Sequence, residues 1–166
     1  MSRPTPAPDA GPAPTGAQTG APFRYLLRVR YGECDTQGVV YNPRYGEYVE
    51  LAGSEFLRAV LAPRNAFDGS LEFQVVKLLI EWRGPARFDD VLDIAVRCTA
   101  IGTTSYTLGL DMRRHGTDAV LVTATTVCVH VDDKTWVKTP LPDDVRRAIE
   151  SGAPGRIVDH AGAGSR

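Results

Sequence analysis

The chain has little cysteine, no excess of basic charge and no long apolar run. Its three cysteines, Cys34, Cys98 and Cys128, are odd in number and widely spaced. They form no C-x-x-C pair and have no histidines at metal-ligand spacing. This argues against a disulfide framework and against structural zinc, and it fits a reducing compartment such as the cytoplasm.

The charges also narrow the range of partners. The 19 basic and 20 acidic residues are scattered and give a formal net charge of −1, whereas phosphate binding needs a local basic excess. No stretch reaches the ~18 consecutive apolar residues of a membrane span, and the N-terminus lacks the apolar core of a signal peptide. We therefore expect a cytoplasmic protein with no nucleic-acid and no membrane partner.

Both ends of the chain differ in composition from its middle. Half of the 12 prolines fall within residues 1–22, a segment of small and polar residues. It predicts a disordered tail rich in Pro, Ala and Gly, with a ligand for a proline-binding domain as the alternative. The Gly/Ala-rich residues 152–166 predict a flexible C-terminal tail. A single domain over residues 23–151 remains.

Periodicity predicts the elements of this domain. Residues 23–32 alternate, with Tyr25, Leu27, Val29 and Tyr31 on one face, which is typical of a strand with one face buried. Asn42-Pro43 is a helix-start signal, Asn42 being the N-cap, and an apolar stripe follows at helical spacing, so a helix is expected over 43–61. Further strands are expected at 73–82, 91–101, 105–112 and 119–131, a hairpin turn at 114–117, and a short final helix at 142–149. The order indicates an α+β fold, and self-association would bury the apolar surface that one helix leaves uncovered.

One segment stands out chemically, residues 31–43. It places Asp35 on a glycine-containing loop ahead of the helix start at Asn42. Unpaired N–H groups at a helix start can polarise a thioester carbonyl and stabilise its oxyanion. A carboxylate on the other side can attack the carbonyl or deprotonate a water molecule. Because a thiolate leaves readily, this hydrolysis needs no metal or cofactor.

The same segment resembles the signature of the 4-hydroxybenzoyl-CoA thioesterase family, whose members have the hotdog fold. The resemblance covers most of residues 23–149 and is carried by the motif Asp-x-x-Gly-Val-Val with a tyrosine in the first helical turn. The matching residues are Asp35, Gly38, Val39, Val40, Tyr41 and Tyr45. The resemblance implies a five-stranded antiparallel sheet wrapped around one long helix, assembled as a homodimer or homotetramer that binds an acyl-CoA.

The resemblance also implies roles for these residues. Asp35 is the catalytic carboxylate, and the backbone N–H of Asn42 assists by polarising the carbonyl. The substrate-binding residues are expected to be Gly38, Val39, Tyr41, Tyr45 and Glu50. Glu50 occupies the position where some aroyl-specific members bind the ring hydroxyl across the dimer. The lead-in to Asp35 favours the aroyl branch.

The expected function is hydrolysis of an acyl-CoA, with a preference for aroyl groups. Gly102, Thr103 and Thr104 stand where some members have a basic run for the nucleotide phosphates, so an acyl-carrier-protein substrate remains an alternative. A non-catalytic acyl-thioester-binding protein is another. A hotdog dehydratase is disfavoured, because no histidine occurs between residues 23 and 114.

Each candidate residue also has a purely structural interpretation. Asp35 could cap its own turn. Cys34 fits a small buried side chain better than a nucleophile, since no histidine is close in sequence. Glu50 could be a solvated helix residue, and Arg83 and Arg87 could be surface charges or contacts to CoA phosphate.

Overall fold

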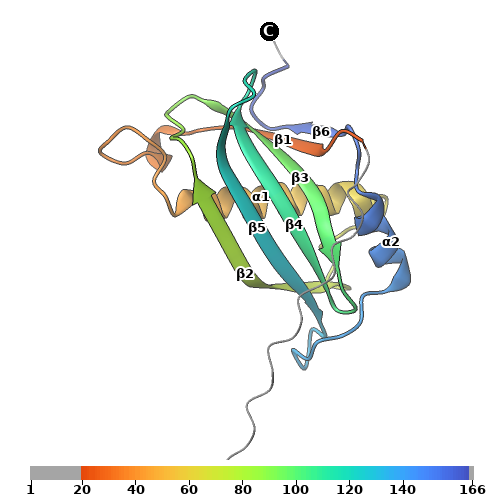
Figure 1. Cartoon of the computed structure of the whole chain (residues 1–166). Helices are drawn as coiled ribbons and strands as arrows, with labels where there is room; N and C mark the ends of the chain where they lie inside the picture. The colour runs from red at the N-terminus through yellow and green to blue at the C-terminus, as the bar shows by residue number, and fades with distance from the viewer. Residues whose placement is uncertain (1–19, 165–166) are drawn as a thin grey trace, which may run out of the picture.

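A computed structural model describes residues 20–164 as one sheet that curves around a long helix (Figure 1). The predicted N-terminal tail, residues 1–22, lies outside the described residues except for its last three. The first strand is followed by a 3-10 turn and the long helix, and then by four strands, a short helix and a last short strand. Their bounds are β1 Phe23–Arg28, η1 Tyr31–Glu33, α1 Arg44–Leu61, β2 Glu72–Trp82, β3 Val91–Ile101, β4 Ser105–Arg114, β5 Val120–Val131, α2 Asp143–Ser151 and β6 Ile157–Asp159.

The strands follow the order β2-β5-β4-β3-β1-β6 across the sheet. Every neighbouring pair is antiparallel except β1–β6, which is parallel. The α+β hotdog arrangement is thus confirmed, with the sheet wrapped around α1. The expected count of five strands is wrong, because β6 forms a sixth within the segment 152–166. This three-residue strand is too short to show a period in the sequence.

The first strand ends earlier than its alternation suggests. β1 stops at Arg28, and the backbone N–H of Val29 donates to the carbonyl of Asp90 at 2.9 Å. The chain then tightens into η1, where a Glu33 carboxylate oxygen accepts a hydrogen bond from the N–H of Arg30 at 2.7 Å. Tyr31 is consequently 82% exposed and does not share the buried face of Tyr25.

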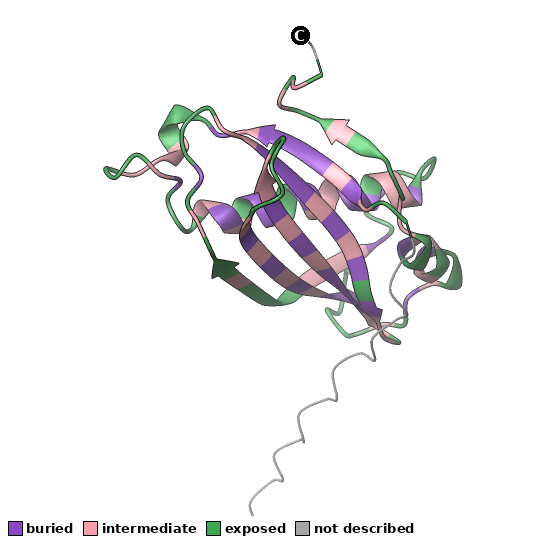
Figure 2. Cartoon of the chain, turned by 45° about the horizontal axis from the view of Figure 1, so that its top comes forward, coloured by how far each residue is buried: buried purple, intermediate pink, exposed green. Residues whose placement is uncertain are grey.

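The core lies between α1 and the inner face of the sheet. The buried face of α1 carries large apolar and aromatic side chains, which recur at helical spacing as the sequence predicted. They are Tyr45, Tyr48, Val49, Ala52, Phe56, Leu57 and Leu61. On β3 to β5 buried and less buried residues alternate along each strand (Figure 2), so the outer face is more accessible. The short helix α2 packs against α1 and β3 through Val145 and Ile149.

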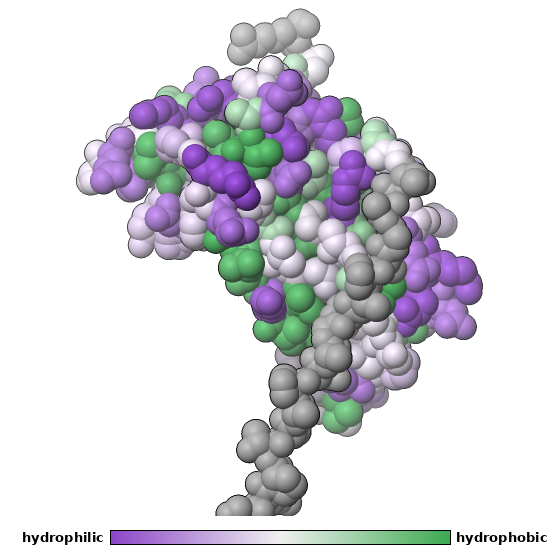
Figure 3. Space-filling model, viewed as in Figure 1, coloured by the Kyte–Doolittle hydropathy of each residue, from purple (hydrophilic) through white to green (hydrophobic). Residues whose placement is uncertain are grey.

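The edge strand β2 differs from the other long strands. Most of its residues are exposed, although the strand is largely apolar. In the space-filling view, apolar residues gather at the lower left of the molecule, over β2 (Figure 3). This edge borders the cavities described next.

Candidate active site

The loop that carries Asp35 folds back on itself before the long helix. Cys34 and Val40 form an antiparallel bridge, and the N–H of Asp35 donates to the carbonyl of Val39 at 2.9 Å. Gly38 closes the turn by donating to the carbonyl of Asp35 at 3.0 Å, and its φ of +72° explains why a glycine is needed there. The tip of the loop is therefore held by backbone bonds.

The Asp35 carboxylate is partly exposed at this tip. One of its oxygens accepts a hydrogen bond from the N–H of Gln37 at 2.8 Å, as the turn-capping interpretation requires. The other oxygen forms no hydrogen bond within residues 20–164. Asp35 thus forms an Asx turn, and its second carboxylate oxygen is open to a ligand.

The start of α1 leaves one backbone donor open. Pro43, not Asn42, is the N-cap residue, so the predicted side-chain cap is wrong. The N–H groups of Arg44 and Tyr45 donate to the carbonyls of Tyr41 and Asn42, at 2.8 and 3.2 Å. Pro43 has no N–H, and the N–H of Asn42 has no acceptor among the described residues. This single amide stands at the positive end of an 18-residue helix, where negative charge is favoured.

An open cavity of about 260 Å³ lies beside this amide, between the end of the Asp35 loop, the helix start and the end of β2. Its lining residues are Val39, Val40, Asn42, Tyr45, Trp82, Gly84 and Pro85. The Tyr45 hydroxyl accepts a hydrogen bond from the N–H of Ala86 at 3.2 Å, which ties the helix start to the chain after β2. Burial raises the pKa of Tyr45 above its ordinary value, so this tyrosine stays neutral.

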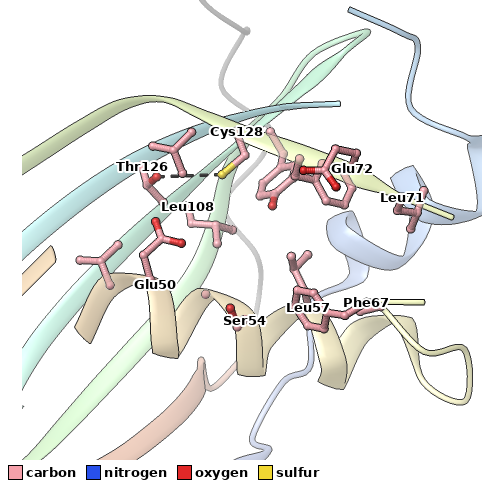
Figure 4. A pocket seen from close by; sticks show the side chains of 15 residues that line it. Glu50, Ser54, Leu57, Phe67, Leu71, Glu72, Leu108, Thr126 and Cys128 are labelled. Carbon is pink, nitrogen blue, oxygen red and sulfur yellow. Dashed lines mark hydrogen bonds between the residues drawn. The ribbon is translucent and has the colours of Figure 1, made fainter. Parts of the chain in front are cut away.

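A second cavity, of about 170 Å³, lies further along α1 and contains Glu50 (Figure 4). In Figure 4 the Glu50 side chain points from the helix toward Thr126 and Cys128 of β5. Desolvation by burial is the main reason that the pKa of the Cys128 thiol is raised, and the nearby Glu50 carboxylate adds to this. The far end of the cavity is apolar, formed by residues such as Leu57, Phe67 and Leu71.

The predicted site residues therefore fall into three groups. Val39, Asn42 and Tyr45 line the first cavity, and Glu50 lines the second. Asp35, Gly38 and Tyr41 line neither cavity of the single chain.

Three residues of the first cavity were missed by sequence reasoning, namely Trp82, Gly84 and Pro85. The Trp82 ring lies 6.2 Å from that of Tyr45, centroid to centroid. The only sequence signal was the Gly-Pro pair after the predicted strand, which marks a turn but not its neighbours.

Other candidate nucleophiles and bases are engaged elsewhere. The Cys34 thiol lies 3.9 Å from the carbonyl of Arg30. His130 and His160 are bonded to the carbonyl of Thr139 and to the hydroxyl of Tyr25, each at 3.1 Å. Within residues 20–164 no group of three or more His, Cys, Asp or Glu side chains could hold a metal ion. In the same range, no helix has the length and apolar character needed to cross a membrane.

Comparisons with known proteins find thioester hydrolases among the relatives of the chain. The chain is 38% identical over 90 residues to the acyl-CoA thioester hydrolase YbgC of Escherichia coli, covering 50% of this chain and 63% of that protein. It therefore spans less than two thirds of this relative. It is 26% identical over 129 residues to the 1,4-dihydroxy-2-naphthoyl-CoA hydrolase of Synechococcus elongatus, covering 74% of this chain and 91% of that one.

A solved structure supports the fold directly. The probable thioesterase of Bartonella henselae superposes with a TM-score of 0.63 at 27% identity, covering 74% of this chain and 99% of that one. Residues 29–149, from the end of β1 into α2, match the thioesterase-like superfamily. The chain belongs to the thioesterase-like superfamily.

Proposed function

We propose that the chain is an acyl-CoA thioesterase that hydrolyses a CoA thioester to the free acid and CoA, with a preference for aroyl groups. The observation that carries the proposal is the open N–H of Asn42 beside a cavity, at the end of the loop that presents Asp35. An amide at a helix start and a carboxylate on the preceding loop are the two parts that thioester hydrolysis requires.

In this mechanism the thioester carbonyl oxygen accepts a hydrogen bond from the Asn42 N–H. Asp35 either attacks the carbonyl carbon or takes a proton from a water molecule that does so. The bond between carbon and sulfur then breaks, and the thiolate of CoA leaves with the electron pair. If water attacked, the free acid forms in this step. If Asp35 attacked, the acyl group is left as an anhydride with Asp35, and water then hydrolyses it to the acid and restores the carboxylate. The positive end of α1 stabilises the negative charge that develops on the carbonyl oxygen. No side chain needs to protonate the leaving group first, because a thiolate is already stable.

The assembly we propose is a dimer formed through the β2 edges, with active sites at the subunit interface. The open edge of β2 and its exposed apolar residues support this, since such an edge is rarely left uncovered. Glu50 of one subunit would then bind a ring hydroxyl of an acyl group held at Asn42 of the other. The proposed assembly is this dimer or a tetramer of two such dimers.

The aroyl preference rests on the lead-in to Asp35 and on the aromatic walls of the cavity. Tyr45 and Trp82 stand edge to face there and offer a surface on which a ring can pack. The curated relative that acts on 1,4-dihydroxy-2-naphthoyl-CoA supports the same class of acyl group.

Coenzyme A, rather than an acyl-carrier protein, is the proposed thiol carrier. The turn at residues 102–104 has no basic side chain, but Arg146 reaches it and donates to the carbonyl of Gly102 at 2.6 Å. A positive charge therefore lies next to the position of the missing basic run. Comparing an acyl-CoA with the same acyl group on a carrier protein decides between the two.

The test is release of thiol from benzoyl-CoA and other acyl-CoA esters by wild type and by Asp35→Asn. This substitution keeps the shape of the side chain and removes its charge, so kcat should fall by at least ~10², the lower end for losing a general base. The matched control is Asp68→Asn, because Asp68 accepts the same kind of turn bond, from the N–H of Ser70 at 2.9 Å, on another loop. Its activity should equal that of wild type.

Each alternative gives a different result. Equal hydrolysis by wild type and Asp35→Asn would reject Asp35 as the catalytic carboxylate. Binding of acyl-CoA without hydrolysis by wild type would favour the non-catalytic acyl-binding protein, and hydrolysis of only the carrier-protein ester would replace CoA as the substrate.

A further inference from the structure

The cavities beside Asn42 and Glu50 lie on the same side of α1. The first is next to Asn42, and the second begins at Val49 and Glu50. On this side α1 faces the sheet, and it carries two glycines there, Gly46 and Gly53, which are two turns apart. Neither position carries a side chain, so at Gly46, between the two cavities, a side chain of the sheet can come close to the helix.

Leu78 of β2 is this side chain. It pairs across the strands with Thr126, which is buried on the inner face of the sheet, so its side chain points toward α1. A methyl group added to Gly46 would lie 3.8 Å from Cδ2 of Leu78, an ordinary van der Waals contact. Leu78 therefore lies over Gly46, and along β2 it stands between Val75, which lines the second cavity, and Trp82, which lines the first.

The spacing along α1 sets a length scale for the acyl group. Helix rise places the level of Gly46 about 6 Å beyond Asn42 and the level of Glu50 about 12 Å beyond it. A single aromatic ring attached to the thioester carbonyl fits between the levels of Asn42 and Gly46. A long alkyl chain would have to pass Leu78 to reach the apolar end of the second cavity, formed by Leu57, Phe67 and Leu71.

We infer that Leu78 is a specificity-determining residue that keeps the acyl group out of the second cavity of the same subunit and excludes long alkyl chains. The inference rests on the proposed thioesterase activity, and it names the residue that sets the substrate class of that same site. The substrate can then enter the second cavity only when a smaller side chain replaces Leu78.

The experiment compares kcat/KM for benzoyl-CoA and dodecanoyl-CoA in wild type and in Leu78→Ala. Wild type should prefer benzoyl-CoA. The ratio of dodecanoyl-CoA to benzoyl-CoA should rise by about tenfold or more in the variant, since a few methylene groups in an apolar pocket change discrimination by that order. Adding Gly46→Ala to Leu78→Ala should reverse part of the gain, because the new methyl group points into the opened passage.

The matched control is Leu79→Ala. Leu79 is the next residue on the same strand and is 48% exposed, against 41% for Leu78, but it points to the outer face. Its substrate ratio should equal that of wild type. If Leu78→Ala does not give a folded protein of wild-type size on gel filtration, Leu78→Val provides the same test with a smaller expected shift.

The outcomes separate this inference from the proposed function. Hydrolysis of benzoyl-CoA with an unchanged substrate ratio in Leu78→Ala overturns the inference and leaves the function intact. So does a wild type that already accepts dodecanoyl-CoA as well as benzoyl-CoA. If wild type hydrolyses no ester, the proposed thioesterase activity is wrong. Calorimetric measurement of acyl-CoA binding then still tests the role of Leu78. Dodecanoyl-CoA should then bind Leu78→Ala at least tenfold more tightly than wild type, with equal binding of free CoA, and equal binding of the ester would overturn the inference.

Discussion

The two edges of the sheet differ in how they are covered. On one side β1 is covered by the short parallel strand β6, and polar side chains fasten the covering segment. On the other side β2 has no further neighbour among residues 20–164, and its exposed side chains are largely apolar. Residues of β2 line both the cavity beside Asn42 and the cavity that contains Glu50.

The closed edge is held by both backbone and side chains. The N–H of Arg24 donates to the carbonyl of Arg156, and the N–H of His160 donates to the carbonyl of Leu26, each at 2.9 Å. The His160 ring bonds the Tyr25 hydroxyl at 3.1 Å, and the Arg28 guanidinium donates to the carbonyl of Ala161. These bonds satisfy groups on β1 that an uncovered edge strand would leave open to another chain.

The open edge lacks such a cover. Val76 is 59% exposed and lies at a break in the pairing register between β2 and β5. Edge strands with exposed apolar residues usually pair with another chain or are protected by charges. Among residues 20–164, β2 is therefore the long strand with an uncovered edge, whereas the other side ends in the three-residue β6, and β2 lies beside the proposed active site.

A charge placed on the open edge is the most direct test of whether β2 forms the interface. In Val76→Lys, the added ammonium groups of two facing subunits would repel each other and could not be buried without a large desolvation cost. We expect the assembly to dissociate to monomers and kcat/KM for acyl-CoA to fall by at least about tenfold. Light scattering after gel filtration measures the mass, and thiol release measures the activity.

The matched control places the same charge on the closed edge. Ile157 of β6 is 52% exposed, similar to Val76, so Ile157→Lys adds an ammonium group at a comparable depth. We expect its mass and its activity to equal those of wild type. If both variants behave alike, or if Val76→Lys keeps its assembly, β2 is not the interface.

The same comparison explains what could be predicted from the sequence. The loop from Asp35 to the helix start was predictable because its signals are local: a glycine for the tight turn, and Asn-Pro before an amphipathic helix. The bounds of β2 to β5 were predicted closely because each strand is long enough to show a pattern. These elements account for the fold class and for the proposed catalytic carboxylate and amide.

The remaining features depend on contacts between distant residues. β6 is only three residues long and exists because β1 offers it a partner. Trp82, Gly84 and Pro85 reach the site because β2 runs beside α1, which no local pattern records. The approach of Leu78 to Gly46 likewise joins a strand and a helix that no local pattern brings together.

A smaller effect should follow from opening the closed edge. A chain ending at Gly155 lacks β6 and loses the backbone and side-chain bonds described for that edge. At about 0.5–1.5 kcal/mol for each hydrogen bond, we expect a loss of about 2–4 kcal/mol in the free energy of unfolding, with new self-association through β1. Chemical denaturation measures the stability, and the control is a chain ending at Gly164, which retains β6. Equal stability of the two chains would show that β6 does not fasten this edge.

The smallest expected effect concerns a charge pair on the side of the sheet near the closed edge. The Asp90 carboxylate accepts hydrogen bonds from Arg114 at 2.9 and 3.0 Å and one from the N–H of Arg87 at 2.9 Å. Desolvation by burial works in the opposite direction, but these donors hold the pKa of Asp90 below its ordinary value. The pair joins the chain before β3 to the end of β4.

The depressed pKa fixes the sign of a pH dependence. Because Asp90 ionises more readily in the folded chain, its contribution to stability is present above the unfolded pKa of about 3.9 and is lost as the pH falls through the folded value. Since Arg114 is partly exposed, solvent screens the pair, and Asp90→Asn should lower the free energy of unfolding at pH 7 by only about 1 kcal/mol. Denaturation between pH 7 and pH 3, at about half-unit steps, should show the curves of wild type and variant converging on the acid side. Parallel curves would mean that the bonds to Arg114 and Arg87 do not stabilise the ionised form, and that the closed side of the sheet is held by its backbone pairing and apolar contacts instead.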